Sequence, residues 1–243
     1  MKIFKNIVLA VRLIESLRCL EPYKSVINKS REDGDFEQER EYILRAMTHW
    51  GSYIVDLFKI DLHVTGKENL PDKGPVVFAA NHQGYADIPV TSVAFDKFQF
   101  AYIARDELEM VPFYGKWMHR IRSIFIKRGD NRAALKTISD GIELLENGFS
   151  LLIFPEGTRS RGRPAGEFKK GSLRLATKPG VPVIPVTIDG TYCIFEEQGY
   201  IRNGVRVDIV IHPAIETKGM DKLTANNLAS EVETIVKSVL HSQ

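Results

Sequence analysis

Short apolar runs alternate with amphipathic segments along most of the chain, from about residue 62 to the C-terminal end. Apolar runs of this length, bounded by turn residues, are typical of buried strands, and residues at helical spacing lie between them. This alternation predicts an α/β fold in which helices flank a mixed, mostly parallel sheet. The predicted strands are 62–65, 76–80, 98–104, 123–126, 151–154, 183–188 and 205–212, and the predicted helices are 88–94, 114–120, 132–147, 173–177 and 222–240.

The N-terminal region has a different pattern, which predicts an amphipathic two-helix motif. Apolar residues recur at helical spacing in 1–20, where Lys and Arg interrupt them, and again in 36–58. The acidic stretch 32–41 predicts a solvated loop between these helices. We therefore expect the chain to divide into this motif, at 1–61, and an α/β domain at 62–243.

Two interpretations of this motif stay open. Aliphatic residues mixed with Lys and Arg, and an interfacial aromatic such as Trp50, favour docking on a membrane surface. Packing of both helices on the core of the main domain explains the periodicity equally well. The longest uncharged stretch near the start, 6–11, is far below the roughly 20 residues that span a bilayer. We expect a peripheral, monotopic protein on the cytoplasmic face of the cell membrane.

Composition narrows the class of protein. The 243 residues are 44% hydrophobic and 26% charged, which is ordinary for a folded protein with a full core. The net charge of +2 gives no general affinity for polyanions, so no nucleic-acid partner is expected. The two cysteines are too few for a disulfide framework, which favours a reducing compartment. The six histidines are scattered without ligand spacing, so no metal and no cofactor are expected.

A histidine and an aspartate five residues apart are the first candidates for chemistry. His82 and Asp87 lie between the predicted strand 76–80 and the predicted helix 88–94. Gly84 gives the turn the backbone freedom to bring the two side chains together, and the first turn of a helix favours an ionised carboxylate. The pair predicts a general base with an orienting partner. The plainer alternative is a loop histidine beside a helix-capping aspartate.

A second stretch, 154–160, leaves another predicted strand and carries Arg159. Seven Lys or Arg residues and one Glu lie in 159–178. Four of these cations, Arg161, Arg163, Lys169 and Lys170, are for the most part expected to belong to a solvated loop. Arg105 and Arg128 also follow predicted strands. The carboxyl ends of parallel strands meet at one edge of a sheet, so the three arginines are expected to converge on one phosphate group.

Four blocks of residues, spread over 81–186, occur in a fixed order. They are Asn81, His82 and Asp87; then Arg105, Glu107, Leu108, Pro112, Gly115 and 125–128; then 154–160, which reads Phe-Pro-Glu-Gly-Thr-Arg-Ser; and finally the Val- and Pro-rich 181–186. Together these blocks resemble the four motifs of the glycerolipid acyltransferase family, in particular those of the 1-acylglycerol-3-phosphate acyltransferases. Two positions depart from the pattern, because many members have Ser at the position of Gly84 and commonly Lys at that of Arg105.

The resemblance implies transfer of a fatty acyl group from a thioester to the sn-2 hydroxyl of lysophosphatidic acid, giving phosphatidic acid in phospholipid biosynthesis. The donor would be acyl-carrier protein or acyl-CoA, and the sequence does not choose between them. No nucleophile motif is visible, so direct transfer in a ternary complex is favoured over an acyl-enzyme. The backbone N–H groups of 83–85 are candidates to stabilise the oxyanion.

The roles of individual residues follow from the motif positions that they match. Glu156 is expected to orient an arginine or a glycerol hydroxyl rather than to act as a base. The implied roles are catalysis for His82 and Asp87, binding of the acceptor's phosphate for Arg105, Arg128 and Arg159, and positioning of the substrate for Glu156, Gly157 and Thr158.

Three other functions compete with this one. Glycerol-3-phosphate or another lysolipid is an alternative acceptor, since enzymes that use them share the motif blocks. A thioesterase, in which His82 activates water, has no need of arginines suited to a phosphate. A non-catalytic lipid-binding protein has no need of an intact pair of His82 and Asp87.

Overall fold

Seven strands form one sheet in the order β1-β7-β6-β2-β5-β3-β4. Neighbouring strands are parallel except β6 and β7, which run antiparallel, so the predicted mixed, mostly parallel sheet is confirmed. The strands of this computed structural model, which describes residues 11–127 and 131–240, are β1 (Asp61–Thr65), β2 (Val77–Ala80), β3 (Phe100–Arg105), β4 (Ile124–Ile126), β5 (Ser150–Ile153), β6 (Val183–Asp189) and β7 (Arg206–Ile211).

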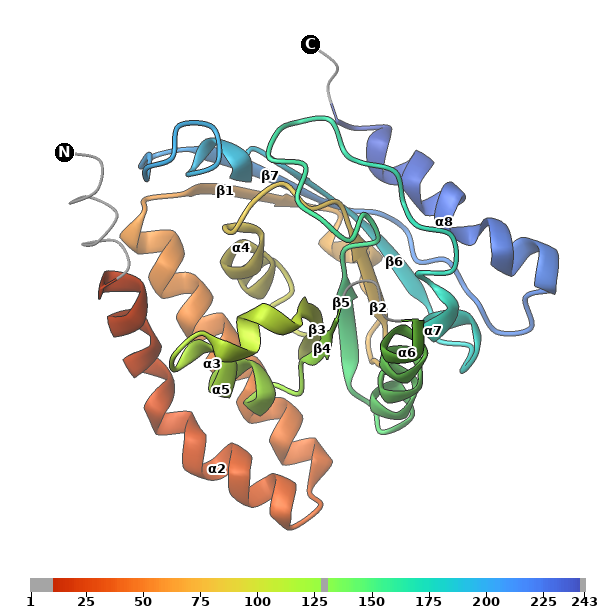
Figure 1. Ribbon diagram of the computed structural model, residues 1–243, viewed down its shortest axis with the longest axis horizontal. Helices are drawn as coiled ribbons and strands as arrows, with labels where there is room; N and C mark the ends of the chain where they lie inside the picture. The colour runs from red at the N-terminus through yellow and green to blue at the C-terminus, as the bar shows by residue number, and fades with distance from the viewer. Residues whose placement is uncertain (1–10, 128–130, 241–243) are drawn as a thin grey trace.

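Helices cover both faces of the sheet. Figure 1 shows α3, α4 and α5 on one side of the strands and α6, α7 and α8 on the other. All the helices predicted after residue 62 are present, and a short 3₁₀ helix, η3 (Asp106–Met110), precedes α5. The helices that flank the sheet are α3 (Phe36–Leu57), α4 (Asp87–Ala94), α5 (Tyr114–Arg120), α6 (Asn131–Glu146), α7 (Arg174–Thr177) and α8 (Lys222–Lys237).

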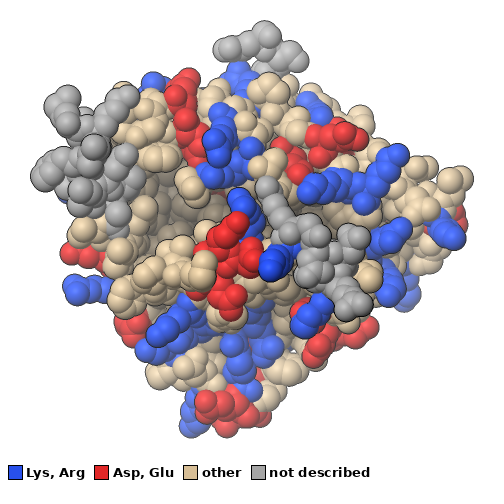
Figure 2. Space-filling view, in the orientation of Figure 1, with Lys and Arg blue, Asp and Glu red and all other residues tan. Residues whose placement is uncertain are grey.

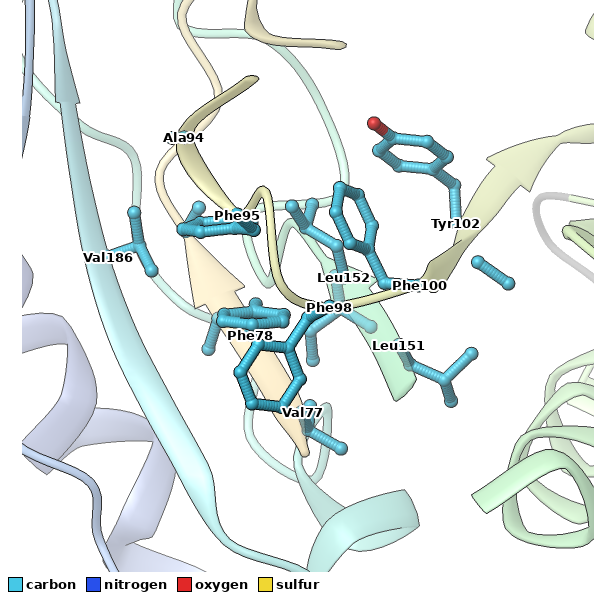
Figure 3. Close-up of a cluster of buried hydrophobic side chains, with 14 of the residues drawn as sticks. Val77, Phe78, Ala94, Phe95, Phe98, Phe100, Tyr102, Leu151, Leu152 and Val186 are labelled. Atoms are coloured by element: carbon cyan, nitrogen blue, oxygen red, sulfur yellow. The ribbon is translucent and has the colours of Figure 1, made fainter. Parts of the chain in front are cut away.

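The central strands are mostly apolar because both of their faces are buried. On one face Phe78 stacks on Phe95 at the end of α4, with ring centroids 4.1 Å apart, and meets Phe98 and Phe100 edge-on (Figure 3). On the other face Leu151 of β5 packs toward α6. Two-sided burial of this kind fixes the strands that carry the candidate residues at their ends.

The N-terminal region contains more helix than the pattern predicted. Residues 11–16 are helical, followed by the 3₁₀ helix η1 (Leu17–Leu20) and by α2 (Glu21–Glu32), whereas the predicted first helix ended at 20. Its start, 1–10, lies outside the described residues. The predicted helix 36–58 is confirmed as α3 (Phe36–Leu57), so the loop predicted at 32–41 is shortened to 33–35. Carboxylates in the first turn of α3 are favoured there by the helix dipole, and the side chain of Asp35 caps the helix.

Helix α3 is fixed to the core of the sheet domain. Gly51 lies against α4 so closely that a Cβ atom would come 2.8 Å from the carbonyl oxygen of Pro89. The buried Glu39 binds Arg31 of α2 and Arg122, which follows α5, each at 2.6 Å. These contacts join both N-terminal helices to the α/β domain, while the predicted division of the chain at residue 61 stays a prediction.

Candidate active site

The loop between β2 and α4 brings His82 and Asp87 together as predicted. Nδ1 of His82 lies 2.6 Å from Oδ2 of Asp87, which is fully buried. The same oxygen accepts the backbone N–H groups of Gln83 at 2.8 Å and Gly84 at 3.0 Å, and Oδ1 accepts the hydroxyl of Thr191. An ionised carboxylate only accepts hydrogen bonds, so Nδ1 of His82 carries the hydrogen. Nε2 is then the imidazole atom that can take a proton.

The motif stretch after β5 holds His82 from three directions. The ring of Phe154 stacks on the imidazole with centroids 3.9 Å apart. The carboxylate of Glu156 accepts the His82 N–H at 2.7 Å, and the backbone N–H of Ser160 donates to the His82 carbonyl at 2.7 Å. The first and third motif blocks therefore form one unit, in which the orientation of the imidazole is fixed before any substrate arrives.

Glu156 differs from the expectation that it orients an arginine. Its two oxygens accept the backbone N–H groups of His82 and of Gly166, each at 2.7 Å, and no arginine of the described chain pairs with it. The turn explains this, because Gly157 has a φ of +67° and the chain sends Glu156 inward and Thr158 outward. Burial raises the pKa of Glu156, and the two N–H contacts oppose the rise.

Arg159 is held by a carboxylate that no motif contains. Its Nη1 lies 3.0 Å from Oε1 of Glu196, and its guanidinium lies 3.6 Å above the ring of Tyr85. The same Glu196 oxygen accepts the backbone N–H of Tyr85 at 2.8 Å. The side chain of Glu196 is only 4% exposed, and burial raises its pKa despite the nearby arginine.

The lack of a side chain at Gly84 leaves room for the carboxylate of Glu196. A Cβ atom at this position would lie 2.5 Å from Oε2 of Glu196, so a larger residue requires the glutamate to move. That oxygen is buried and has no hydrogen-bond partner in the described chain. The absence of the serine that many family members carry here is therefore matched by a carboxylate that occupies the space.

The predicted oxyanion site is not formed in this conformation. The N–H groups of His82, Gln83, Gly84 and Tyr85 donate to Glu156, Asp87, Asp87 and Glu196, respectively. Each of these donors is therefore already used by a carboxylate. The expected oxyanion donors differ from this arrangement because the nearby Asp87 accepts the N–H groups of Gln83 and Gly84, while the distant Glu196 accepts that of Tyr85.

Of the remaining predicted arginines, the described chain places Arg105 at this edge of the sheet. The strands β2, β5, β3 and β4 are consecutive and parallel, so the residues that follow them share an edge. Arg105, at the end of β3, is half-exposed and pairs with Glu107 at 2.6 Å. No contact of Arg105 with His82 or Arg159 occurs within the described chain. Arg128 lies outside the described residues.

Two further residues tie the site to β6. The buried side chain of Asn81 bonds both the N–H and the carbonyl of Ile188, each at 2.8 Å. Thr191, just after β6, supports Asp87 from the side opposite to His82. Asn81 precedes the histidine in the motif, and this contact explains structurally why an amide at that position helps to place the loop.

The fold and this site define an enzyme of the acyltransferase family, to which the chain belongs. The family model described as Acyltransferase matches residues 61–189. A 1-acyl-sn-glycerol-3-phosphate acyltransferase of Borreliella burgdorferi is 33% identical, over 74% of this chain and 72% of its own length. A chloroplastic enzyme of the same name from Arabidopsis thaliana is 35% identical over 72% of this chain, but the match covers only 49% of that longer protein.

A solved structure is similar over almost the whole length. The crystal structure of the 1-acyl-sn-glycerophosphate (LPA) acyltransferase PlsC from Thermotoga maritima is 31% identical. It aligns with a TM-score of 0.78 over 98% of this chain and 95% of that one. The family predicted from the four motif blocks is thus confirmed, and the N-terminal helices belong to the shared fold.

Proposed function

We propose that this enzyme transfers a fatty acyl group from an acyl thioester to the sn-2 hydroxyl of lysophosphatidic acid, giving phosphatidic acid. The observation that carries the proposal is the pair of His82 and Asp87, whose 2.6 Å contact leaves Nε2 of the imidazole free to act as a base. The names of the relatives support the choice of acceptor. The donor is a thioester of acyl-carrier protein or of coenzyme A.

In this mechanism His82 acts on the acceptor rather than on the donor. Nε2 takes the proton of the 2-hydroxyl while the oxygen attacks the thioester carbonyl. Asp87 stabilises the imidazolium that forms. The carbon–sulfur bond then breaks, and the imidazolium returns its proton to the leaving thiolate. The new ester and the free thiol account for all atoms, and no acyl-enzyme is formed.

Arginines select the phosphorylated acceptor. Arg159 lies next to the histidine loop through Tyr85 and Ser160, and Arg105 and Arg128 follow neighbouring strands of the same edge. A guanidinium binds a phosphate through charge-assisted hydrogen bonds. Before the acceptor binds, Glu196 holds Arg159, so the phosphate has to share or replace that contact. Glu156 positions the substrate indirectly, by fixing His82, and Gly157 and Thr158 shape the rim of the site.

The N-terminal helices dock the enzyme on the cytoplasmic face of the membrane. Val11, Leu13 and Ile14 expose their side chains, while the inner face of α3 is buried. Within the described residues, no helix combines the length and the apolar character that a membrane span requires. Deletion of 1–60 is not a fair test, because it removes α3 from the core. The substitution Ile14→Ser changes an exposed side chain and leaves the core intact. It is expected to reduce flotation of the protein with liposomes.

A panel of acceptors tests the reaction. The enzyme is incubated with a labelled acyl thioester alone, with lysophosphatidic acid, and with glycerol-3-phosphate, and the labelled products are separated. We expect labelled phosphatidic acid only when lysophosphatidic acid is present. Labelled lysophosphatidic acid from glycerol-3-phosphate would assign the alternative acceptor, and free fatty acid without any acceptor would assign a thioesterase.

A further inference from the structure

A turn between η3 and α5 exposes a run of apolar side chains. The turn is 110–113, with the sequence Met-Val-Pro-Phe. Met110 is 80% exposed, Phe113 66% and Val111 41%, whereas isolated apolar residues are common on protein surfaces but contiguous large ones are not. The turn lies inside the second motif block, yet none of its side chains points into the core.

The backbone holds this turn in a conformation that bulky residues rarely adopt. Phe113 has a φ of +64° and a ψ of −43°, and the N–H of Tyr114 donates to the carbonyl of Pro112 at 2.7 Å, which defines a tight γ-turn. Gly115 donates to Val111 at 2.9 Å and fits against the Glu109 carbonyl, where a Cβ atom would lie at 1.9 Å. The surroundings therefore impose the strained turn and present an aromatic ring to the outside.

The turn is continuous with the N-terminal apolar surface. Trp117 of α5, the helix that starts at the turn, and Ile121, the residue after this helix, line an apolar pocket together with Leu17 of η1. Leu17 lies three residues after Ile14, which is exposed like Val11 and Leu13. Figure 1 places α5 and α2 on the same side of the sheet, and Figure 2 shows largely uncharged surface to the left of centre on this face.

The charges around the turn are nearly balanced. The exposed carboxylates of Glu107 and Glu109 are already paired, with Arg105 at 2.6 Å and with His119 at 2.8 Å. Lys116, on the first turn of α5, is exposed and has no carboxylate within 4.0 Å in the described chain, and the half-buried Asp106 of η3 has no cation within that distance there. An apolar tip with little net charge around it matches the interface of a bilayer.

We propose that the turn 110–113 inserts Met110 and Phe113 into the surface of a bilayer, as a second contact beside residues 11–17. The inference extends the membrane docking proposed above, which it presupposes. A bilayer is the occupant that fits best, because the turn offers flexible and aromatic apolar groups but no polar pattern by which a protein partner would be selected. Two separated contacts would also fix the tilt of the active-site edge relative to the membrane, which a single helix does not do.

The sharpest variant is Phe113→Gly in the full chain. Glycine adopts a positive φ without strain, so the turn is kept while the ring is removed. The matched control is Leu223→Gly, which removes an apolar side chain that is 71% exposed at the start of α8. Flotation with vesicles of phosphatidylcholine containing phosphatidic acid is compared for the two variants and the unmodified protein, without any substrate present.

We expect Phe113→Gly to weaken vesicle partitioning by about tenfold, the effect of losing one apolar side chain from such a contact, and Leu223→Gly to leave it unchanged. In addition, Phe113→Trp should gain fluorescence quenching by brominated lipid, whereas Leu223→Trp should not. Flotation of Phe113→Gly equal to that of the unmodified protein, or no quenching at Phe113→Trp, would overturn the inference. Flotation does not depend on acyl transfer, so failure of the proposed reaction would be recognised separately.

Discussion

The loop that carries His82 and the turn that carries Phe113 both lie at the same edge of the sheet, but one is held by polar contacts and the other exposes apolar side chains. In the first, carboxylates accept each backbone N–H from residue 82 to residue 85. In the second, apolar side chains remain exposed although the backbone is rigidly held. The comparison teaches that the same backbone rigidity can be built with buried polar contacts, as in the loop proposed for catalysis, or beneath exposed apolar side chains, as in the turn proposed to meet lipid.

Substitutions in the two regions should have clearly different effects on the rate of acyl transfer. His82→Ala is expected to lower kcat by about 10²–10⁴, because removal of a general base has effects of that size. The fold should persist, since the imidazole lies at the surface of the site and is 19% exposed. Rates are measured with a short-chain acceptor that stays dissolved, and circular dichroism checks the fold. Phe113→Gly is the control, and its rate under these conditions should equal that of the unmodified enzyme.

Arg159→Ala should raise the KM for the acceptor by roughly tenfold to a hundredfold, with little change in the KM for the donor. The lost charge-assisted contacts with a phosphate correspond to about 1.5–3 kcal/mol. Arg174→Ala, an exposed arginine of the same basic stretch, is the matched control. A change confined to the donor would remove Arg159 from acceptor binding.

Glu196→Gln should lower the KM for the acceptor severalfold. The amide oxygen can still accept the N–H of Tyr85, but the negative charge that competes with the phosphate for Arg159 is gone. Steady-state kinetics at varied acceptor concentration measure the effect. An increase in KM would instead show that the carboxylate is needed to position Arg159.

The smallest effect concerns stability and pH. Burial raises the pKa of Glu196 above its ordinary value of 4.5, so the folded protein binds this proton more readily than the unfolded chain. The ionised carboxylate therefore reduces stability above the raised pKa, and the reduction disappears as the pH falls through it. Urea unfolding should show Glu196→Gln at its greatest advantage over the unmodified protein near about pH 7 and at a smaller one near about pH 5. A difference that is constant with pH would contradict this.

The strands and helices that the sequence predicted each leave a pattern within a short stretch of residues. Strands such as β2 and β5 are buried on both faces, so their apolar runs are unbroken, and each predicted strand and helix after residue 62 is present. His82 and Asp87 were predictable because both lie in one short loop. Helix α2 was missed since Ile27 and Ser30 are its only buried residues in the described chain, which leaves a weak periodicity.

The rest of the site depends on contacts between distant parts of the chain. Glu196 and Thr191 follow β6 and contact the histidine loop although more than a hundred residues separate them from it in the sequence. Neither residue lies in a motif block. A single sequence contains no signal for such pairing. For the same reason the N–H group of Tyr85, which Glu196 occupies, was expected to be a free donor. The γ-turn at Phe113 was also hidden, because an apolar residue before a helix usually predicts burial.

The central claim is that His82 activates the acceptor's hydroxyl and that the acyl group never resides on the enzyme. The most direct test follows thiol release and the mass of the intact protein after mixing enzyme with an acyl thioester, first without and then with lysophosphatidic acid. The account predicts no adduct and no thiol until the acceptor is added, and then one thiol for each phosphatidic acid formed. A burst of thiol with an acylated protein before the acceptor arrives would contradict it.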